Sequence, residues 1–346
     1  MTTFMRDLVK QINSENTYIA DDEESSSEFT GGIDTGSYIL NAAFSGSIFG
    51  GIPNNKITAL AGETSTGKTF FALGMIKHFL DSDPEAGVVY YDTEAAVTKK
   101  IMTDRGIDPE RVMVVEPTTI QEFRKHALDI LEAVGKEHPP MVFVLDSLGQ
   151  LSTTKEIEDT AEGKETRDMT KAQVIKATFR VLGLKLAKAK IPLVITNHVY
   201  DVIGSYFPMK EMSGGSGLKY SASQIVFLSK KKEKDGTEVV GNIIKCRMVK
   251  SRFTKENKEV EVRLTYDKGL DKHYGLLELA ESAGLMKKVS TRYELPDGSK
   301  VFGKEINRNP TKYFDDEMLK KLDEHAGKIF MYGDHDDVEL YEAEEE

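Results

Sequence analysis

One run of eight residues has the composition and spacing of a phosphate-binding loop. It consists of Gly62, Glu63, Thr64, Ser65, Thr66, Gly67, Lys68 and Thr69, which fits the pattern G-x-x-x-x-G-K-[ST]. The glycines let backbone N–H groups curl around the β- and γ-phosphates, the lysine adds a point charge, and the threonine hydroxyl can ligate Mg²⁺. An ordinary glycine turn is the bland alternative. Because an apolar run precedes the motif and a helical pattern follows it, the chain is predicted to bind a nucleoside triphosphate.

Two further apolar runs end in acids. Residues 141–145 lead into Asp146 and Ser147, the form of a strand whose carboxylate holds a hydrated metal ion beside the phosphates. Residues 88–91 lead to Glu94, where a carboxylate could polarise the water that attacks the γ-phosphate. Acids at strand ends also cap helices. The residues alone therefore leave Glu94 open between catalysis and capping.

A third apolar run, 193–196, ends in Asn197 and His198, at the type of sheet edge where open α/β folds bind ligands. Either side chain could hydrogen-bond the γ-phosphate, although a lone histidine is often structural. The glycine-rich segment 199–217 that follows carries aromatic and cationic residues suited to unstacked bases. Those residues are Tyr200, Tyr206, Phe207 and Lys210, with Gly214 and Gly215 in its glycine run. A surface loop with partly buried aromatics is the alternative.

The elements that must position these residues alternate along the chain. Buried strands are predicted at 57–61, 88–91, 112–115, 141–145 and 193–196, and helices near 68–80, 97–105, 119–134 and 169–190. This alternation predicts an α/β fold whose mostly parallel, twisted sheet carries helices on both faces. Strands at 225–228, 239–249 and 260–266 lack intervening helices, and the first two join across Asp235-Gly236. They predict an antiparallel extension of the sheet.

Composition divides the 346 residues into four parts. We expect an N-terminal helix and linker over 1–30, a core over 31–272, a small C-terminal lobe over 273–332 and an acidic, disordered tail over 333–346. The net charge of −11 argues against a nucleic-acid binder. However, eight of the acids lie in the last 13 residues, which hold no Lys or Arg. The average charge is therefore misleading.

Several classes of protein are disfavoured. No apolar run approaches the ~20 residues of a membrane span, and the N-terminus does not resemble a signal peptide. Cys246 is the single cysteine, so an intrachain disulfide cannot form. With 39% hydrophobic residues the chain can bury a core. A globular protein of the cytoplasm is expected.

Taken together, the motifs resemble the RecA family of strand-exchange recombinases, and within it the UvsX group of tailed bacteriophages. The resemblance runs from about Gly31 to Leu285. It rests on the phosphate loop and on residues 91–94, 145–147, 197–198, 213–220 and 249–252. It implies a RecA-like core that binds ATP and Mg²⁺, with Thr69 and Asp146 on the metal. It further implies a DNA-dependent ATPase that forms a filament on single-stranded DNA and pairs it with homologous double-stranded DNA.

The resemblance also assigns roles. Glu94 matches the family's water-activating glutamate, and His198 stands where a side chain senses the γ-phosphate. Lys250 and Arg252 match a basic pair that reaches into a neighbouring subunit's nucleotide site. The alternative is that both residues only form a solvent-exposed strand end. Residues 151–168 and 199–215 match two DNA-binding loops. Lys155 and Arg167 are the expected phosphate contacts of the first loop.

Outside the core, the N-terminal segment resembles the part that packs on the adjacent subunit, and the acidic tail resembles a competitor for the DNA groove. Ile101 stands where bacterial relatives stack an aromatic ring on the adenine, which leaves base selectivity open. A mediator and a single-strand-binding protein are the accessory partners that the resemblance suggests, in a host cell's cytoplasm if the chain is phage-encoded.

Two alternative functions share this pattern. A ring-forming helicase or a clock-type ATPase is built on the same core, and fold alone does not decide between them. A nucleotide-binding switch is disfavoured because the Asn-Lys-x-Asp guanine signature is missing. A small-molecule kinase is disfavoured because Lys250 and Arg252 on a late strand have no obvious task in a monomeric kinase.

Overall fold

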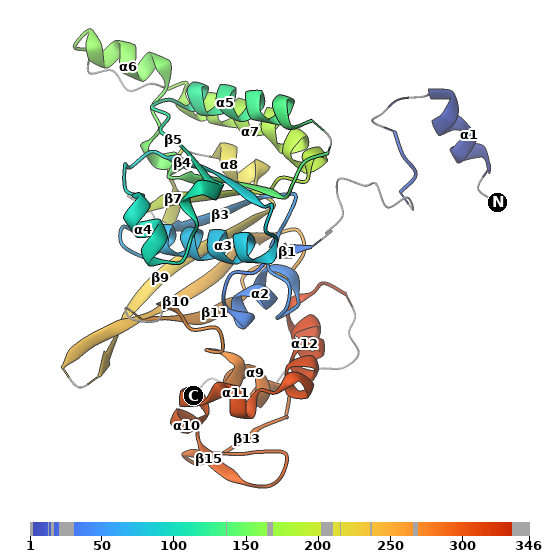
Figure 1. The fold of residues 1–346 in the computed structure, drawn as a ribbon, viewed down its shortest axis with the longest axis vertical. Coiled ribbons are helices and arrows are strands. Elements are labelled where there is room, and N and C mark those ends of the chain that lie inside the picture. Colours follow the sequence, from blue (N-terminus) through green and yellow to red (C-terminus); the bar gives the residue numbers. More distant parts are fainter. Residues whose placement is uncertain are drawn as a thin grey trace.

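A twisted sheet of ten strands organises the chain (Figure 1). The computed structural model describes residues 3–12, 14, 17–20, 31–135, 137–164, 169–201, 210–214, 216–235, 237–265 and 269–333. Within this part of the chain, no helix is both long and apolar enough to cross a bilayer.

The strand order of the sheet is β12-β11-β10-β9-β3-β7-β6-β4-β5, with β8 paired to β7. The strands are β3 (Ile57–Gly62), β4 (Gly87–Asp92), β5 (Val112–Val115), β6 (Met141–Asp146), β7 (Leu193–Asp201), β8 (Lys210–Met212), β9 (Gln224–Asp235), β10 (Glu238–Ser251), β11 (Glu259–Thr265) and β12 (Gly269–Leu270). The six strands from β9 to β5 run parallel, so their carboxyl ends all lie at the same end of the sheet, which is called the carboxyl edge below. The mostly parallel sheet with an antiparallel extension is confirmed.

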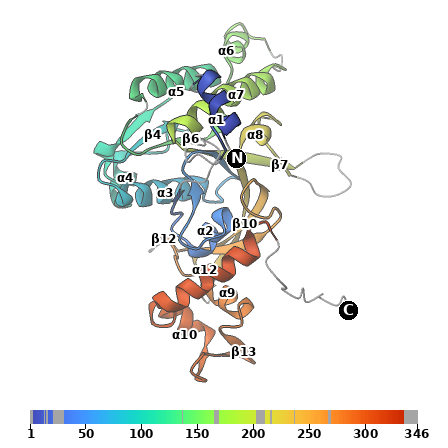
Figure 2. The same cartoon turned by 90° about the vertical axis from the view of Figure 1, so that its right-hand side faces the viewer.

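Side chains alternate along the parallel strands and divide the interior into two cores. On β4, Val88 and Tyr90 join one apolar cluster, and Val89 and Tyr91 join the other. The first core is covered by α3 (Lys68–Ser82), α4 (Lys99–Asp104) and α2 (Tyr38–Ser45), and the second by α5 (Ile120–Val134), α7 (Lys171–Ala189) and α8 (Ser216–Ser221). Figure 2 shows the sheet between α3 and the α5–α7 layer. Both faces are covered because each face of such strands is apolar.

The predicted strands and helices all occur, with some differences in extent. The strand after residue 193 continues to Asp201, because β8 pairs with its outer half as an antiparallel hairpin. The prediction that 112–115 is buried is wrong, since β5 is an edge strand whose Met113 is 54% exposed. Short helices were not predicted at α2, nor at α6 (Thr154–Ala161) within the first loop. They have too few turns for a clear apolar period.

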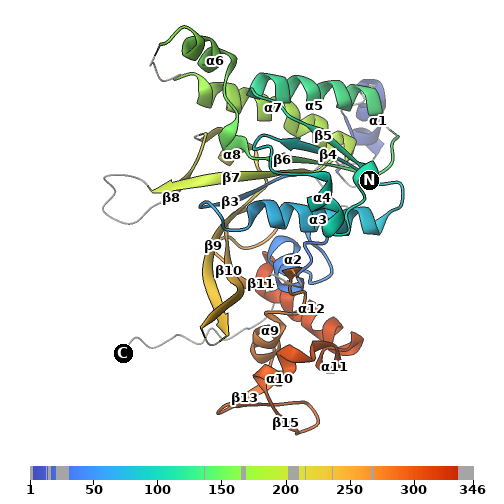
Figure 3. The same ribbon diagram turned by 60° about the vertical axis from the view of Figure 1, so that its left-hand side comes forward.

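The antiparallel extension projects beyond the carboxyl edge of the parallel strands. β9 and β10 form a long hairpin, which bends away from the sheet in Figure 3. Its first strand carries Lys230, Lys231, Lys232 and Lys234. The hairpin therefore presents several lysines at the same end of the strands as the phosphate loop.

The C-terminal segment packs directly on the sheet domain. It contains α9 (Leu276–Ser282), β13 (Lys287–Val289), β14 (Arg292–Glu294), β15 (Lys300–Phe302), α10 (Gly303–Arg308), α11 (Pro310–Tyr313) and α12 (Asp316–Phe330). Asp323 of α12 accepts hydrogen bonds from the Ser47 hydroxyl and the Ile48 N–H, each 2.7 Å long. Leu322 and Phe330 belong to the first core. The division into a core and a separate lobe at residue 272 stays a prediction.

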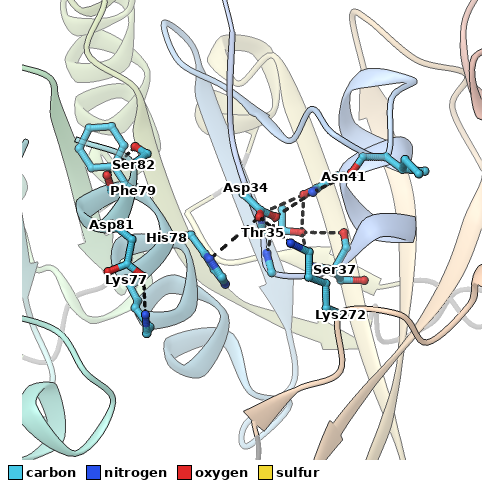
Figure 4. A network of polar contacts seen from close by, with 12 residues as sticks. Asp34, Thr35, Ser37, Asn41, Lys77, His78, Phe79, Asp81, Ser82 and Lys272 are labelled. Carbon is cyan, nitrogen blue, oxygen red and sulfur yellow. Dashed lines mark hydrogen bonds and ion pairs between the residues drawn. The ribbon is translucent and has the colours of Figure 1, made fainter. Parts of the chain in front are cut away.

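A polar network joins the start of the core to α3 and to the segment that leads into α9 (Figure 4). Asp34 accepts from the Asn41 amide at 2.8 Å and lies 4.0 Å from both His78 and Lys272. Short strands β1 (Gly32–Ile33) and β2 (Ile52–Pro53) pair beside it. The network fixes the chain where it enters the domain.

Helix α1 (Thr3–Ile12) confirms the expected N-terminal helix and lies apart from the sheet domain in Figure 1. Its apolar side chains are exposed, with Phe4 at 75% and Ile12 at 53%. An exposed apolar stripe on a helix is typical of a surface that packs against another chain.

Candidate functional site

The phosphate-binding motif occupies the turn between β3 and α3. Ser65 and Gly67 adopt positive φ values of 61° and 92°, which curl the backbone back toward the strand. A side chain at Gly62 would meet the Thr66 hydroxyl at 2.6 Å and the Leu228 carbonyl at 2.9 Å. Glycine is therefore required at that position. The turn has the geometry that the motif predicts, with the N-terminus of α3 facing into it.

Lys68 is 7% exposed and is held within the loop. Its Nζ donates to the carbonyls of Gly62 and Glu63 at 3.0 and 2.9 Å. Burial lowers the pKa of Lys68 below its ordinary value of 10.5, whereas the carboxylates of Glu94 and Asp146 act in the opposite direction. The ammonium of Lys68 thus lies among the residues predicted to bind phosphate, to act as the base and to bind the metal.

Asp146 ends β6 as a buried carboxylate, only 4% exposed. One oxygen accepts from the Tyr90 hydroxyl at 2.7 Å, and the other accepts from the Thr196 hydroxyl. Two neutral donors fix the carboxylate without neutralising its charge. The charge of Asp146 in turn raises the pKa of Tyr90, after the larger effect of burial.

These residues fit a magnesium ion held mainly by phosphate oxygens. Mg²⁺ prefers oxygen ligands and usually takes only one or two carboxylates from a protein, with water and phosphates completing its shell. Asp146 supplies such a carboxylate, and Thr69 lies in the first turn of α3 with a partly exposed side chain. In the described part of the chain, no group of three or more His, Cys, Asp or Glu could hold a metal alone. A metal at this site would therefore depend on bound nucleotide.

Glu94 follows β4 in a tight turn at the same edge. Asp92 accepts from the backbone N–H groups of Glu94 and Val97 at 3.1 and 2.9 Å. The Oε1 atom of Glu94 accepts from the Ser147 hydroxyl at 2.8 Å and lies 3.4 Å from Nε2 of His198. The glutamate side chain remains 33% exposed. Its contacts are to the side chains of Ser147, which follows β6, and His198 on β7. Its catalytic role stays a prediction.

Asn197 links this site to the segment that follows β7. Its side chain is fully buried, and its amide nitrogen donates to the Ser213 carbonyl at 2.9 Å. Its amide oxygen accepts from the His198 N–H, and the Ser213 N–H donates to the His198 carbonyl, both at 2.9 Å. The amide is therefore engaged with the base of the second loop. Direct contact between Asn197 and a phosphate stays a prediction.

Two lysines approach the outer side of the phosphate loop. Lys210 on β8 forms an ion pair with Glu63, and Lys230 on β9 donates to the Ser65 carbonyl. The carboxylate of Glu63 raises the pKa of Lys210, and Lys210 lowers the pKa of Glu63. The loop thus contacts both elements that project beyond the nucleotide edge of the sheet.

Lys250 and Arg252 lie near the amino ends of the parallel strands, away from the carboxyl edge that carries the phosphate loop. Lys250 pairs with Ile225 at the start of β9, and Ile225 pairs with Ala59 of β3, three residues before the loop. The Lys250 Nζ donates to the carbonyls of Lys219 and Ala222 at 2.7 Å. Burial, and secondly Arg252, lowers the pKa of Lys250. The pair is not brought to the phosphate loop of its own chain.

The predicted DNA-contact residues are described only in part. Lys155 is exposed on α6, which the Glu156–Lys171 ion pair ties to α7 at 3.1 Å. Tyr200 is 59% exposed on β7. At Gly214, φ is 83° and a side chain would meet Ile175 at 2.7 Å, so glycine is needed for the turn. The predictions for Arg167, Tyr206, Phe207 and Gly215 concern positions outside the described residues, as does the prediction for the acidic tail from residue 334 onward.

A cleft of about 610 Å³ opens beside the first turn of α3, between α3, α4 and β12. Ile101, Phe70 and Arg105 line it, and the Arg105 guanidinium lies 4.2 Å from the centre of the Phe70 ring. Phe70 directly follows Thr69 of the phosphate motif. The cleft thus presents an aromatic and a cationic surface beside Ile101.

Sequence reasoning missed the residues that support the site. Tyr90 and Thr196 lie within apolar strands, and only their placement one strand away from Asp146 shows their role. The lysines of residues 230–234 were not predicted to lie near the phosphate loop. The sequence carries no signal for that contact, because it depends on how β9 pairs with β3.

Comparison with known proteins identifies the family of this chain. The RecA N-terminal domain family matches residues 6–271. The "Recombination and repair protein" of Enterobacteria phage T4 is 32% identical over 250 residues, which cover 72% of this chain and 63% of that protein. "Protein RecA" of Ruminococcus albus is 30% identical, covering 77% and 64%. "Protein RecA" of Thermus thermophilus is 27% identical, covering 89% of each chain. The chain thus spans slightly less than two thirds of the first two relatives.

Proposed function

This chain belongs to the RecA family, and we propose that it is an ATP-dependent recombination protein. In this proposal it forms a filament on single-stranded DNA, pairs that strand with homologous double-stranded DNA, and hydrolyses ATP in a DNA-stimulated manner. ATP and Mg²⁺ lie between neighbouring copies. The proposal extends to a cytoplasmic location and to accessory proteins that load the filament.

The observation that supports the proposal is that the residues predicted to act on one nucleotide lie at two opposite ends of the parallel strands. The phosphate loop, Glu94 and His198 lie at the carboxyl edge. Lys250 and Arg252 lie near the amino ends of those strands. A cation that completes a phosphate site from another subunit acts as an arginine finger. In the proposal, a second copy stacked head to tail supplies Lys250 and Arg252 to this site.

In the proposed reaction each residue of the chain has a limited task. The loop amides and Lys68 bind the β- and γ-phosphates, and Glu94 orients the attacking water and accepts its proton. Thr69 and Asp146 would hold Mg²⁺, which would supply positive charge to neutralise the phosphates. Lys250 and Arg252 of the next copy stabilise charge that develops as the γ-phosphate leaves. His198 then loses a phosphate contact.

The link from hydrolysis to DNA grip runs through β7. His198 contacts Glu94 by its side chain and Ser213 by its carbonyl, so both ends of the second loop meet at this residue. We infer that loss of the γ-phosphate contact at His198 releases residues 199–217 from their DNA-gripping arrangement. A phosphate contact whose loss releases a segment is a known form of molecular switch.

Electron microscopy with single-stranded DNA and a non-hydrolysable ATP analogue tests the proposal. Helical filaments are the expected result. Closed particles of six subunits would instead support the ring-forming helicase or clock-type ATPase, because a heterologous contact gives rings when its rotation closes and filaments when it does not.

A further inference from the structure

We infer that Ser147 is a positioning residue that holds the catalytic glutamate, and not a ligand of the nucleotide. The inference rests on the proposed ATP hydrolysis and deepens it. Ser147 follows the metal-binding Asp146 directly and is fully buried. Its hydroxyl donates to Oε1 of Glu94 at 2.8 Å, the shortest side-chain contact that the structure gives this glutamate.

The serine is itself fixed to the strand that carries Glu94. Its backbone N–H donates to the Thr93 hydroxyl at 2.7 Å, and the same hydroxyl donates to the Ser147 carbonyl at 2.9 Å. The Thr93 N–H donates to the Asp146 carbonyl at 2.9 Å. These three hydrogen bonds join the ends of β4 and β6. The Ser147 hydroxyl is therefore a rigid donor, placed independently of the glutamate it contacts.

Both side-chain neighbours of Glu94 lie at one carboxylate oxygen. Ser147 donates to Oε1, and Nε2 of His198 lies 3.4 Å from the same atom. Among the described residues, Oε2 has no corresponding contact. A glutamate side chain has three rotatable bonds, so without a fixed donor it would leave a catalytic geometry most of the time. Ser147 thereby leaves Oε2 as the oxygen that meets the water.

The arrangement also fixes the base relative to the metal site. Asp92 and Asp146 are direct partners in the parallel β4–β6 pair. Asp92 holds the turn that carries Glu94, and Asp146 is followed by the serine that holds its carboxylate. The separation between base and metal ligand is thus set by two strands and one hydroxyl.

Ser147→Ala tests the assignment in the full-length protein with single-stranded DNA. We expect kcat for ATP hydrolysis to fall about tenfold. This decrease is at least ten times smaller than the decrease caused by losing a general base. KM and ATP affinity should stay within about twofold, because the phosphate contacts remain. Ser147→Thr, which keeps the hydroxyl, should recover most of the loss. Ser37→Ala is a matched control, since Ser37 is also fully buried but its hydroxyl makes no hydrogen bond among the described residues.

A double-mutant cycle separates positioning from other roles. In a Glu94→Gln background, Ser147→Ala should lower the residual rate little further, because residues that act through one another are not additive. The same tenfold loss in both backgrounds, or a parallel loss of ATP affinity, would overturn the inference. So would an unchanged kcat in Ser147→Ala.

A crystal structure of Ser147→Ala gives a readout that does not depend on activity. Glu94 should lose its single position while Asp146 keeps its contacts to Tyr90 and Thr196. An unmoved Glu94 side chain would contradict the positioning role even if the chain were not an ATPase. Absence of hydrolysis by the unmodified protein would instead contradict the proposed function.

Discussion

Lys68 and Lys250 lie at opposite ends of the parallel strands of the same sheet. Lys68 begins α3 at the carboxyl end of β3, whereas Lys250 pairs with Ile225 near the beginning of the parallel strand β9. Both are partly desolvated cations, and burial is the first cause of the lowered pKa of each. A sheet that separates two such cations cannot bring them to one triphosphate within a single copy. Their joint action requires a contact between copies.

The connection between nucleotide and DNA predicts a specific defect in His198→Ala. ATP binding should remain, because the loop and Lys68 are intact, but stimulation of hydrolysis by single-stranded DNA should fall by about tenfold. Steady-state hydrolysis with and without DNA measures the ratio. His138→Ala serves as the control, because His138 lies between α5 and β6 and contacts the Ala189 carbonyl at the C-terminal end of α7. Stimulation at the unmodified level together with an unchanged filament lifetime would refute the link.

The ion pair between Glu63 and Lys210 predicts opposite effects of its two halves on DNA affinity. Glu63→Gln frees Lys210 for DNA phosphates and should strengthen single-stranded DNA binding about two- to fivefold, the range of a surface pair. Lys210→Gln should weaken single-stranded DNA binding and reduce the slope of the logarithm of the binding constant against the logarithm of the salt concentration by about one. Glu110→Gln removes the same charge far from the site. Fluorescence anisotropy across salt concentrations is the measurement, and equal effects of Glu63→Gln and Glu110→Gln would contradict the prediction.

The lowered pKa of Lys68 predicts an alkaline limit to nucleotide binding. The charged ammonium favours the triphosphate, so affinity is greatest while Lys68 is protonated and falls as pH rises through its pKa. Because burial lowers that pKa from 10.5, the decline should begin at a lower pH than for an exposed lysine. ATP binding between about pH 8 and pH 10.5, without DNA, measures it. Lys68→Arg should stay flat over this range; a parallel decline in both proteins would assign the effect elsewhere.

The acidic tail predicts a gain of function on truncation before Asp334. A tethered anion competes with phosphate for the same cations, so its removal should strengthen binding to double-stranded DNA and shift the salt dependence. Equal affinity with and without residues 334–346, at matched ionic strength, would leave the tail a role in solubility alone.

The fold was largely predictable because its parallel strands are buried on both faces. Continuous apolar runs such as 141–145 mark such strands directly. The edge strand β5 and the outer half of β7 were misjudged because tertiary pairing, not composition, decides whether Met113 is exposed and where the strand ends. The strands β13 to β15, three residues each, are too short for a period to show.

The site was predictable where a residue type has one chemical task at a fixed spacing. Lys68 in the phosphate motif is such a case. The hydrogen bond from Ser147 to Glu94 could not be predicted, because it joins residues 53 apart in the chain. Lys230 was not predicted at all. Its contact depends on the register of β9 against β3, which no local pattern encodes.

The central claim is that two copies share one nucleotide site, and mixing two inactive variants tests it most directly. Glu94→Gln lacks the base on one side of each interface, and Arg252→Ala lacks a cation on the other. In an equal mixture on single-stranded DNA, about one interface in four combines both intact halves. We predict that the mixture regains about a quarter of the unmodified ATPase rate, while each variant alone stays inactive. A mixture no more active than its separate components would contradict the shared site.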